Sequence, residues 1–126
     1  MRIDELMTKS PTTCRPDDTL SEAAQTMLHN GCGCLPVTAS DGSQRLTGMI
    51  TDCDICRETR FGWGTLKALR VRHAMMKNIR PCHPGDTLAE ARAAMREARV
   101  LHLPVVDESD QVIGLVSRAD LVSEAA

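Results

Sequence analysis

The sequence predicts an α+β fold built from two copies of a β-α-β-β-α unit, because three motifs occur twice in the same order. Each motif recurs 68 or 66 positions later, residues 18–23 as 86–91, residues 35–37 as 103–105, and residues 48–54 as 114–120. The difference of two positions falls in one polar turn, which holds Thr38-Ala39-Ser40 in the first copy and Val106 alone in the second. Length changes confined to a surface turn are typical of two diverged copies of one structural unit.

The length of the chain limits how the two copies can be organised. A chain of 126 residues buries roughly two thirds of its unfolded surface, which is too little for two large independent domains. The copies are therefore expected to pack on each other as one module. We predict repeat 1 over residues 1–60, a linker over 61–70 and repeat 2 over 71–126.

The composition, with 42% hydrophobic and 25% charged residues, is that of an ordinary globular domain. No apolar run approaches the roughly 20 residues that cross a bilayer, and Met1–Glu5 lacks the apolar stretch of a secretory signal. We expect a cytoplasmic protein that is not inserted in a membrane. In that compartment the six cysteines are expected to be reduced thiols.

A short strand, around Thr12–Cys14 or Arg80–Cys82, is expected to open each repeat. In the first copy a helix is predicted over about residues 20–30. Thr19 and Glu22 form the T-x-x-E capping pattern, and Gly31 suits the left-handed residue that ends a helix. Apolar residues at helical spacing mark the buried face of this helix, which comprises Leu20, Ala23, Ala24, Met27 and Leu28.

The second copy repeats the helix with two differences. Thr87 and Glu90 repeat the capping pattern, but Arg99 stands where the first copy has its terminal glycine. The apolar stripe is narrower and consists of Leu88, Ala91, Ala94, Met95 and Ala98.

Two strands and a closing helical segment complete each repeat. The strands are predicted at Cys34–Thr38 and Leu46–Ile50 in the first copy, and at Leu101–Val106 and Val112–Val116 in the second. Their β-branched residues favour strands, and Asp, Gly and Ser mark the turn between them.

The linker contains Phe61-Gly62-Trp63-Gly64, which holds the only aromatic residues of the chain. Alternating glycines predict a loop, and Leu66, Leu69 and Val71 have the spacing of a short helix. We expect the two rings to cover the contact between the copies. Stacking on a ligand base or contact with a partner is the alternative.

Charge is distributed unevenly along the chain. Residues 57–80 carry seven basic and one acidic side chain, whereas residues 1–56 and 81–126 each carry four basic and eight acidic ones. This basic insert is interpreted as a solvated connector whose charges lie near the acidic wings. A surface for nucleic acid or a partner is the alternative, although stacking aromatics beyond Phe61 and Trp63 are absent.

The repeated motifs resemble the cystathionine-β-synthase (CBS) domain, which typically occurs as a tandem pair called a Bateman module. The resemblance rests on D-T-L-x-E-A, on Leu-Pro-Val and on G-h-h-[S/T]-x-x-D, in that order in both copies. It covers roughly Ile3 to Val122, and is strongest to the small stand-alone prokaryotic pairs. The resemblance implies a pseudo-twofold pair whose sheets pack across a central cleft. It further implies two candidate sites for AMP, ADP, ATP, NAD or S-adenosylmethionine, and a homodimer.

The [S/T]-x-x-D motif has a chemical meaning of its own. A carboxylate in the first turn of a helix can accept two hydrogen bonds from a ribose diol, and the helix N-terminus attracts a phosphate. The candidate pairs are Thr51 with Asp54 and Ser117 with Asp120. The alternative is that Thr51 and Ser117 only cap the last helices.

The two copies differ at the positions that are expected to contact a charged group of the ligand. The resemblance implies that the residue two before the proline reaches the phosphates, and Cys34 and His102 occupy these positions. The neighbouring position is Asp52 in one copy and Arg118 in the other. Because phosphate needs a cation, we hypothesise that Ser117, Asp120 and His102 bind the phosphorylated ligand. The site of Thr51, Asp54 and Cys34 would then be empty or bind a less anionic adenosyl group. A packed strand residue is the alternative role of His102.

The resemblance also implies that the opposite copy supplies the walls of each base pocket. Thr12, Cys32 and Gly33 are the expected wall residues of the second site, and Arg80 and Val100 those of the first. Small or apolar residues suit a flat base.

Cysteines outside the family pattern leave other functions open. Cys32-Gly33-Cys34 and Cys53-x-x-Cys56, with His29 or His102, could hold Zn²⁺ or sense redox state. Small buried thiols are the favoured interpretation. The common nucleophile, P-loop and metal-hydrolase motifs are absent, so an enzyme is not expected. We interpret the chain as a non-catalytic sensor that needs no cofactor and passes ligand occupancy through its dimer to a protein partner.

Overall fold

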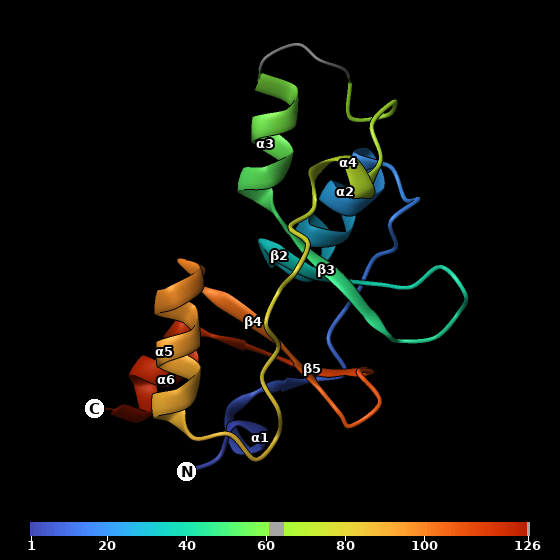
Figure 1. Ribbon diagram of the computed structural model, residues 1–126. Helices are drawn as coiled ribbons and strands as arrows, with labels where there is room; N and C mark the ends of the chain where they lie inside the picture. The colour runs from blue at the N-terminus through green and yellow to red at the C-terminus, as the bar shows by residue number, and fades with distance from the viewer. Residues whose placement is uncertain (61–64, 126) are drawn as a thin grey trace. The chain divides into compact units, whose positions relative to one another are not determined.

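The structure is a computed structural model, and it describes residues 1–60 and 65–125. Its contacts divide the chain into two compact units. The first-repeat unit consists of Thr12–Asn78, and the second-repeat unit consists of Met1–Pro11 together with Ile79–Ala126. Each unit has an antiparallel strand pair and its own helices, as Figure 1 shows. The predicted α+β class with two repeats is confirmed.

In the first-repeat unit, a hairpin lies between two helices in the sequence. Helix α2 (Leu20–Asn30) leads into strands β2 (Cys34–Thr38) and β3 (Leu46–Thr51). Helix α3 (Asp52–Arg60) follows β3 directly, and the short helix α4 (Val71–Ala74) contacts α3. The strands pair in antiparallel register, with a bulge where the turn begins.

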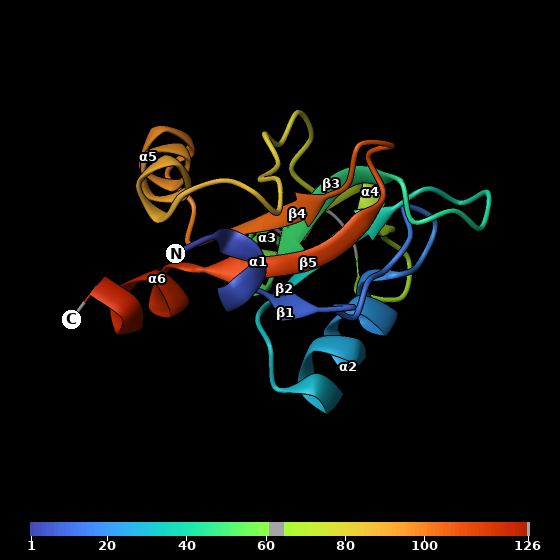
Figure 2. The same cartoon turned by 90° about the horizontal axis from the view of Figure 1, so that it is seen from below.

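The second-repeat unit has the same plan and one more strand. Its elements are α1 (Ile3–Leu6), β1 (Thr8–Lys9), α5 (Leu88–Ala98), β4 (His102–Val106), β5 (Val112–Ser117) and α6 (Arg118–Ala125). The sheet has the order β1-β5-β4. Because α5 precedes β4 and α6 follows its antiparallel partner β5, the two helices lie at the same end of the hairpin (Figure 2).

The strands predicted before each main helix are reduced to single parallel bridges. Cys14 pairs with Val37, and Cys82 pairs with Val105. A longer ladder would next need an amide hydrogen two residues further on. Pro16 and Pro84 stand there, and proline has no amide hydrogen.

Each unit is completed by an arm that comes from the other repeat. Residues 70–78 pair with β3, where Met49 and Met76 exchange backbone hydrogen bonds with N–O distances of 3.0 and 2.7 Å. Residues 2–10 pair with β5 in the same manner through β1. The two arms are a fourth repeated segment of the sequence, in addition to the three motifs described above. Their equivalent residues are Arg2, Ile3, Met7 and Lys9 in the first arm and Arg70, Val71, Met75 and Lys77 in the second. The sequence prediction missed it because its identities are scattered.

The helix boundaries follow the predicted capping residues. The Thr19 hydroxyl accepts a hydrogen bond from the Glu22 amide at 3.0 Å, and Thr87 caps α5 in the same way. Gly31 ends α2 in the left-handed conformation with φ of 60°. Arg99 ends α5 in the same conformation with φ of 56°, without the freedom of glycine.

The linker closes the start of helix α2. The carbonyls of Leu66 and Leu69 accept hydrogen bonds from the amides of Ser21 and Leu20, at 2.8 and 2.9 Å. These amides would otherwise lack a partner within the helix. Leu66 lies in a turn rather than in the short helix predicted around it, which forms instead at Val71–Ala74. The predicted aromatic loop, Phe61 to Gly64, lies outside the described residues.

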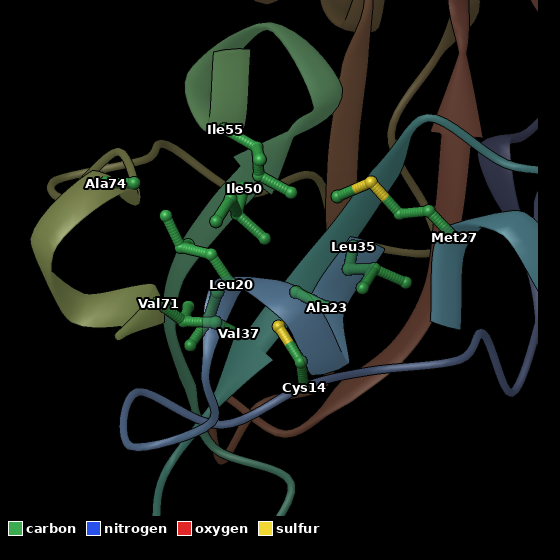
Figure 3. Packing of buried hydrophobic residues seen from close by; sticks show 10 residues of the cluster. All are labelled: Cys14, Leu20, Ala23, Met27, Leu35, Val37, Ile50, Ile55, Val71 and Ala74. Carbon is green, nitrogen blue, oxygen red and sulfur yellow. The ribbon is translucent and has the colours of Figure 1, made fainter. Parts of the chain in front are cut away.

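A separate hydrophobic cluster fills each unit. Figure 3 shows the cluster of the first-repeat unit, in which Leu20, Val37 and Ile50 are fully buried. The prediction that Leu28 belongs to this core is wrong, because its side chain is 82% exposed. One residue along a helix turns by about 100°, which carries Leu28 past the face that holds Met27. Ala98 is likewise exposed rather than buried.

The cluster of the second-repeat unit is built on Ile3, Leu103, Val105, Val116 and Leu121. No helix in the described part of the chain is long and apolar enough to span a membrane.

Candidate functional site

Both [S/T]-x-x-D motifs form a closed pair of hydrogen bonds at a strand-to-helix junction. The Asp54 amide donates to Thr51 Oγ1 at 3.1 Å, and the Thr51 amide donates to Asp54 Oδ2 at 2.9 Å. Ser117 and Asp120 repeat both bonds, at 3.2 and 2.9 Å. In each copy the hydroxyl and the Oδ2 atom of the carboxylate are therefore used in capping the helix. The remaining oxygen, Oδ1, is the atom whose contacts can differ between the two copies.

The two carboxylates do differ at Oδ1. Asp54 is only 3% exposed, and its Oδ1 lies 3.3 Å from the guanidinium of Arg57. Asp120 is half-buried, and within the described residues it forms no ion pair. A ligand hydroxyl would have to compete with Arg57 in the first copy, whereas the second copy offers its carboxylate without that competition. Sequence reasoning missed Arg57, although its spacing of three residues on a helix was the available signal.

The pairing of the strands places the two residues that were predicted to contact phosphate opposite the residues that carry these hydroxyls. Cys34 lies opposite Thr51, and His102 lies opposite Ser117. The Cys34 side chain is buried, and this burial, reinforced by Cys32 and Asp54, raises the pKa of the thiol to about 12. A neutral thiol offers no charge to a phosphate. The imidazole of His102, which is half-buried, is a side chain that can be cationic near neutral pH.

The segment before each hairpin is tied to the helix start. The Asp52 amide donates to the Gly33 carbonyl at 2.9 Å, and the Arg118 amide donates to the Leu101 carbonyl at 2.8 Å. Gly33 is held so close that an added Cβ would lie 3.0 Å from Asp52 Oδ2. The structure thus brings Cys32 and Gly33 next to Asp52 of their own copy.

Other predicted wall residues have local partners. The Thr12 hydroxyl lies 3.3 Å from Asn30 Oδ1, and Arg80 lies 3.4 Å from the Glu97 carboxylate. Val100 packs against the second hydrophobic cluster. Each of these contacts lies within one unit, so the assignment of walls to the opposite copy stays a prediction.

The cysteines separate into buried and accessible groups. Cys14, Cys34 and Cys82 are buried. Desolvation raises the pKa of Cys14 to about 12 and that of Cys82 to about 11, which keeps these thiols protonated and weakly reactive. Cys53 and Cys56 are exposed on α3, so the expectation of buried thiols is wrong for these two residues, and Cys32 is half-buried. Within residues 1–60 and 65–125, no three His, Cys, Asp or Glu side chains are grouped closely enough to hold a metal ion.

Part of the basic insert is engaged with acidic neighbours. Arg57 pairs with Asp54, and Arg72 pairs with Asp17. Arg70 also donates to the Asp17 carbonyl at 2.9 Å. These contacts agree with a connector whose charges lie against acidic segments.

Comparison with known proteins gives one family for both halves. The chain matches the CBS domain over residues 3–60 and again over residues 71–126. A CBS domain-containing protein of Dictyostelium discoideum is 32% identical, and the match covers 95% of this chain and 88% of that protein. A homoserine O-acetyltransferase of Methanocorpusculum labreanum is 28% identical over 96% of this chain but only 23% of its own length. The chain thus spans about a quarter of the length of that relative.

Solved structures with the same fold carry different ligands. Hypoxic Response Protein I with two coordinated zinc ions is 25% identical, with a TM-score of 0.86 and coverage of 98% of both chains. A CBS domain pair in complex with 5′-methylthioadenosine and S-adenosyl-L-methionine has a TM-score of 0.88 at 22% identity, covering 99% of this chain and 95% of that one. CBSX2 in complex with AMP has a TM-score of 0.82 at 20% identity, covering 98% and 95%.

Proposed function

Since the chain belongs to the CBS domain family, we propose that it is a regulatory module that binds an adenosine-containing ligand and signals occupancy through a homodimer. Structures of this fold hold AMP, 5′-methylthioadenosine and S-adenosyl-L-methionine, which supports an adenosyl ligand. The described part of the chain is accounted for by the two repeats. We therefore do not extend the acetyltransferase activity of the longer relatives to it.

The observation that carries the site assignment is the difference between the two carboxylates. Asp120 has no competing cation among the described residues, whereas Asp54 is buried against Arg57. The guanidinium of Arg118 adds a cation at the start of the helix that follows Ser117, and the imidazole of His102 lies on the strand opposite Ser117. We infer that Ser117, Asp120 and His102 hold the ribose and phosphate of an adenine nucleotide. Charge-assisted hydrogen bonds to phosphate are roughly twice as strong as neutral ones.

The first copy suits a different occupant or none. In the first copy the residue opposite the Thr51 hydroxyl is Cys34, whose thiol is neutral, and helix α3 begins with Asp52. An anion near Asp52 would be repelled. Thr51, Asp54 and Cys34 would therefore accept an uncharged or cationic adenosyl group, if they bind a ligand at all.

Signalling follows from unequal affinity. A ligand shifts a conformational equilibrium only by the difference between its affinities for the two states. The proposed ligand would bias one arrangement of the dimer, and a protein partner would read that arrangement.

A thermal-shift screen of the intact chain tests this function. AMP, ADP or ATP is expected to raise the unfolding midpoint by roughly 10 °C at about 100 times its Kd, because binding to the folded state alone adds about 2.7 kcal/mol. NAD and S-adenosylmethionine belong in the same screen. Zinc does as well, since Hypoxic Response Protein I coordinates it. Stabilisation by zinc without any adenosyl ligand would replace the nucleotide sensor by a metal sensor, and no shift at all would leave a structural dimeriser.

A further inference from the structure

The cation beside the Asp54 carboxylate distinguishes the first copy from the second. In helix α3 the Arg57 guanidinium lies 3.3 Å from Asp54 Oδ1, and the two residues are three positions apart on the helix. The position equivalent to Arg57 in helix α6 holds Ser123, an uncharged residue. Each copy therefore has the same carboxylate at the start of its last helix, but only the first copy has an arginine three residues after it.

The two members of this ion pair differ in their exposure to solvent. The Asp54 side chain is 3% exposed, whereas the Arg57 side chain is 65% exposed. An exposed side chain that touches a buried atom lies on the solvent side of that atom, which is the side from which a ligand would approach. The other carboxylate oxygen, Oδ2, accepts a hydrogen bond from the Thr51 amide at 2.9 Å. Both oxygens of Asp54 are therefore engaged within the chain.

A neutral ligand hydroxyl is a poor replacement for the Arg57 guanidinium. A carboxylate that is removed from water is costly unless a cation stays beside it. A ribose hydroxyl at Oδ1 would supply a hydrogen bond but no positive charge. Asp52, two residues before Asp54, adds a second negative charge to the same helix start. Displacement of the guanidinium by a neutral ligand would thus leave two acidic side chains together without a compensating cation.

We propose that Arg57 is the specificity-determining residue of the first copy, and that it closes the Asp54 carboxylate to the ribose of an uncharged nucleoside. This inference rests on the proposed function, which leaves the first copy either empty or open to an uncharged or cationic adenosyl group. It assigns the exclusion of uncharged adenosine to one side chain. Removal of the guanidinium leaves Asp54 Oδ1 without its donor, and the vicinal hydroxyls of a ribose can then donate to it.

Adenosine tests this assignment, because it has the ribose but carries no phosphate for the second copy to bind. The titrations use chains with Asp120→Ala, so that the second copy contributes no carboxylate. In that background Arg57→Ser is expected to strengthen adenosine binding at least tenfold in isothermal titration calorimetry. The further addition of Asp54→Ala is expected to remove the gain. Arg45→Ser removes the same charge from an exposed turn, and as the matched control it is expected to leave adenosine binding unchanged.

Two results of this titration would overturn the proposal. Unchanged adenosine affinity in a folded Arg57→Ser chain would show that the guanidinium does not close the site. Weaker affinity would make Arg57 a contact of the ligand rather than a block. Thermal unfolding of each variant shows that the chain is folded, because Asp54 loses its cation in this change.

The reciprocal change is made in the second copy and leaves helix α3 intact. Ser123→Arg places an arginine three residues after Asp120 on helix α6, as Arg57 follows Asp54 on α3. In the otherwise wild-type chain it is expected to weaken adenosine binding at least tenfold. Ser123→Gln adds a long side chain without the charge and is expected to change the Kd less than threefold. Unchanged affinity in Ser123→Arg would contradict the proposal, and this result can be obtained even where Arg57→Ser does not fold.

AMP titration of the wild-type chain separates this inference from the proposed function. Normal AMP binding without a gain of adenosine binding in Arg57→Ser would count against this inference alone. Absence of AMP binding, together with the gain of adenosine binding in Arg57→Ser, would count against the proposed function alone.

Discussion

Asp120→Ala is expected to weaken AMP binding at least 100-fold, whereas Asp54→Ala is expected to leave the Kd within about threefold of wild type. The Asp120 carboxylate has lone pairs available beyond the bond it accepts from the Ser117 amide. Two ribose hydroxyls donating to an ionised carboxylate contribute about 1.5–3 kcal/mol each. Isothermal titration calorimetry with AMP measures both variants.

The control for this prediction separates binding from helix capping. Each alanine variant also loses a cap at the start of α6 or α3, which costs about 1 kcal/mol. Asp120→Asn retains an oxygen that can accept from the Ser117 amide but lacks the charge. We expect it to restore the thermal stability of the chain and not the affinity. Loss of AMP binding in Asp54→Ala with full binding in Asp120→Ala would reverse the assignment of the two sites.

Gly48→Ala is expected to lower the free energy of unfolding by about 3 kcal/mol, the upper end of the range for overpacking. An added Cβ would lie 2.5 Å from the Met76 carbonyl and 3.2 Å from Met75 Sδ. The carbonyl is backbone and is fixed by its hydrogen bond from the Met49 amide, so the whole arm of residues 70–78 would have to move. Urea unfolding measures the loss.

The equivalent glycine of the second copy provides the matched comparison. A Cβ on Gly114 would overlap the Met7 side chain rather than backbone. Because a methionine side chain is flexible, we expect Gly114→Ala to cost less than Gly48→Ala, and the addition of Met7→Ala to recover part of the loss. If Gly114→Ala lowered the free energy of unfolding as much as Gly48→Ala or more, or if Met7→Ala recovered none of that loss, the contact with the arm would not be the cause of the destabilisation.

The features of local origin could be predicted from the sequence. Thr19, Thr87 and Gly31 cap helices through contacts within a few residues, so their spacing sufficed to place the helix ends. The strand pairs and the Ser117–Asp120 pair follow from motifs that lie next to each other in the chain. Duplication added a check, because each copy predicted the elements of the other.

The remaining features depend on contacts between distant segments. The exposure of Leu28 is decided by which elements cover α2, and periodicity alone cannot supply that information. Each of the arms around Met7 and Met75 packs on the other repeat, and a prediction of this would have needed knowledge of which repeat each arm contacts. The Arg57–Asp54 ion pair is local, but its importance for the site appears only when Asp120 is compared with it.

The stoichiometry of AMP binding to the wild-type chain tests the central claim, which is that the second copy binds a phosphorylated ligand and the first copy does not. Isothermal titration calorimetry is expected to give one AMP bound per chain. Asp120 forms no ion pair with any described residue and lies in the copy that has His102, whereas the Asp54 carboxylate is paired with Arg57. Two AMP molecules bound per chain with equal affinity would contradict the account.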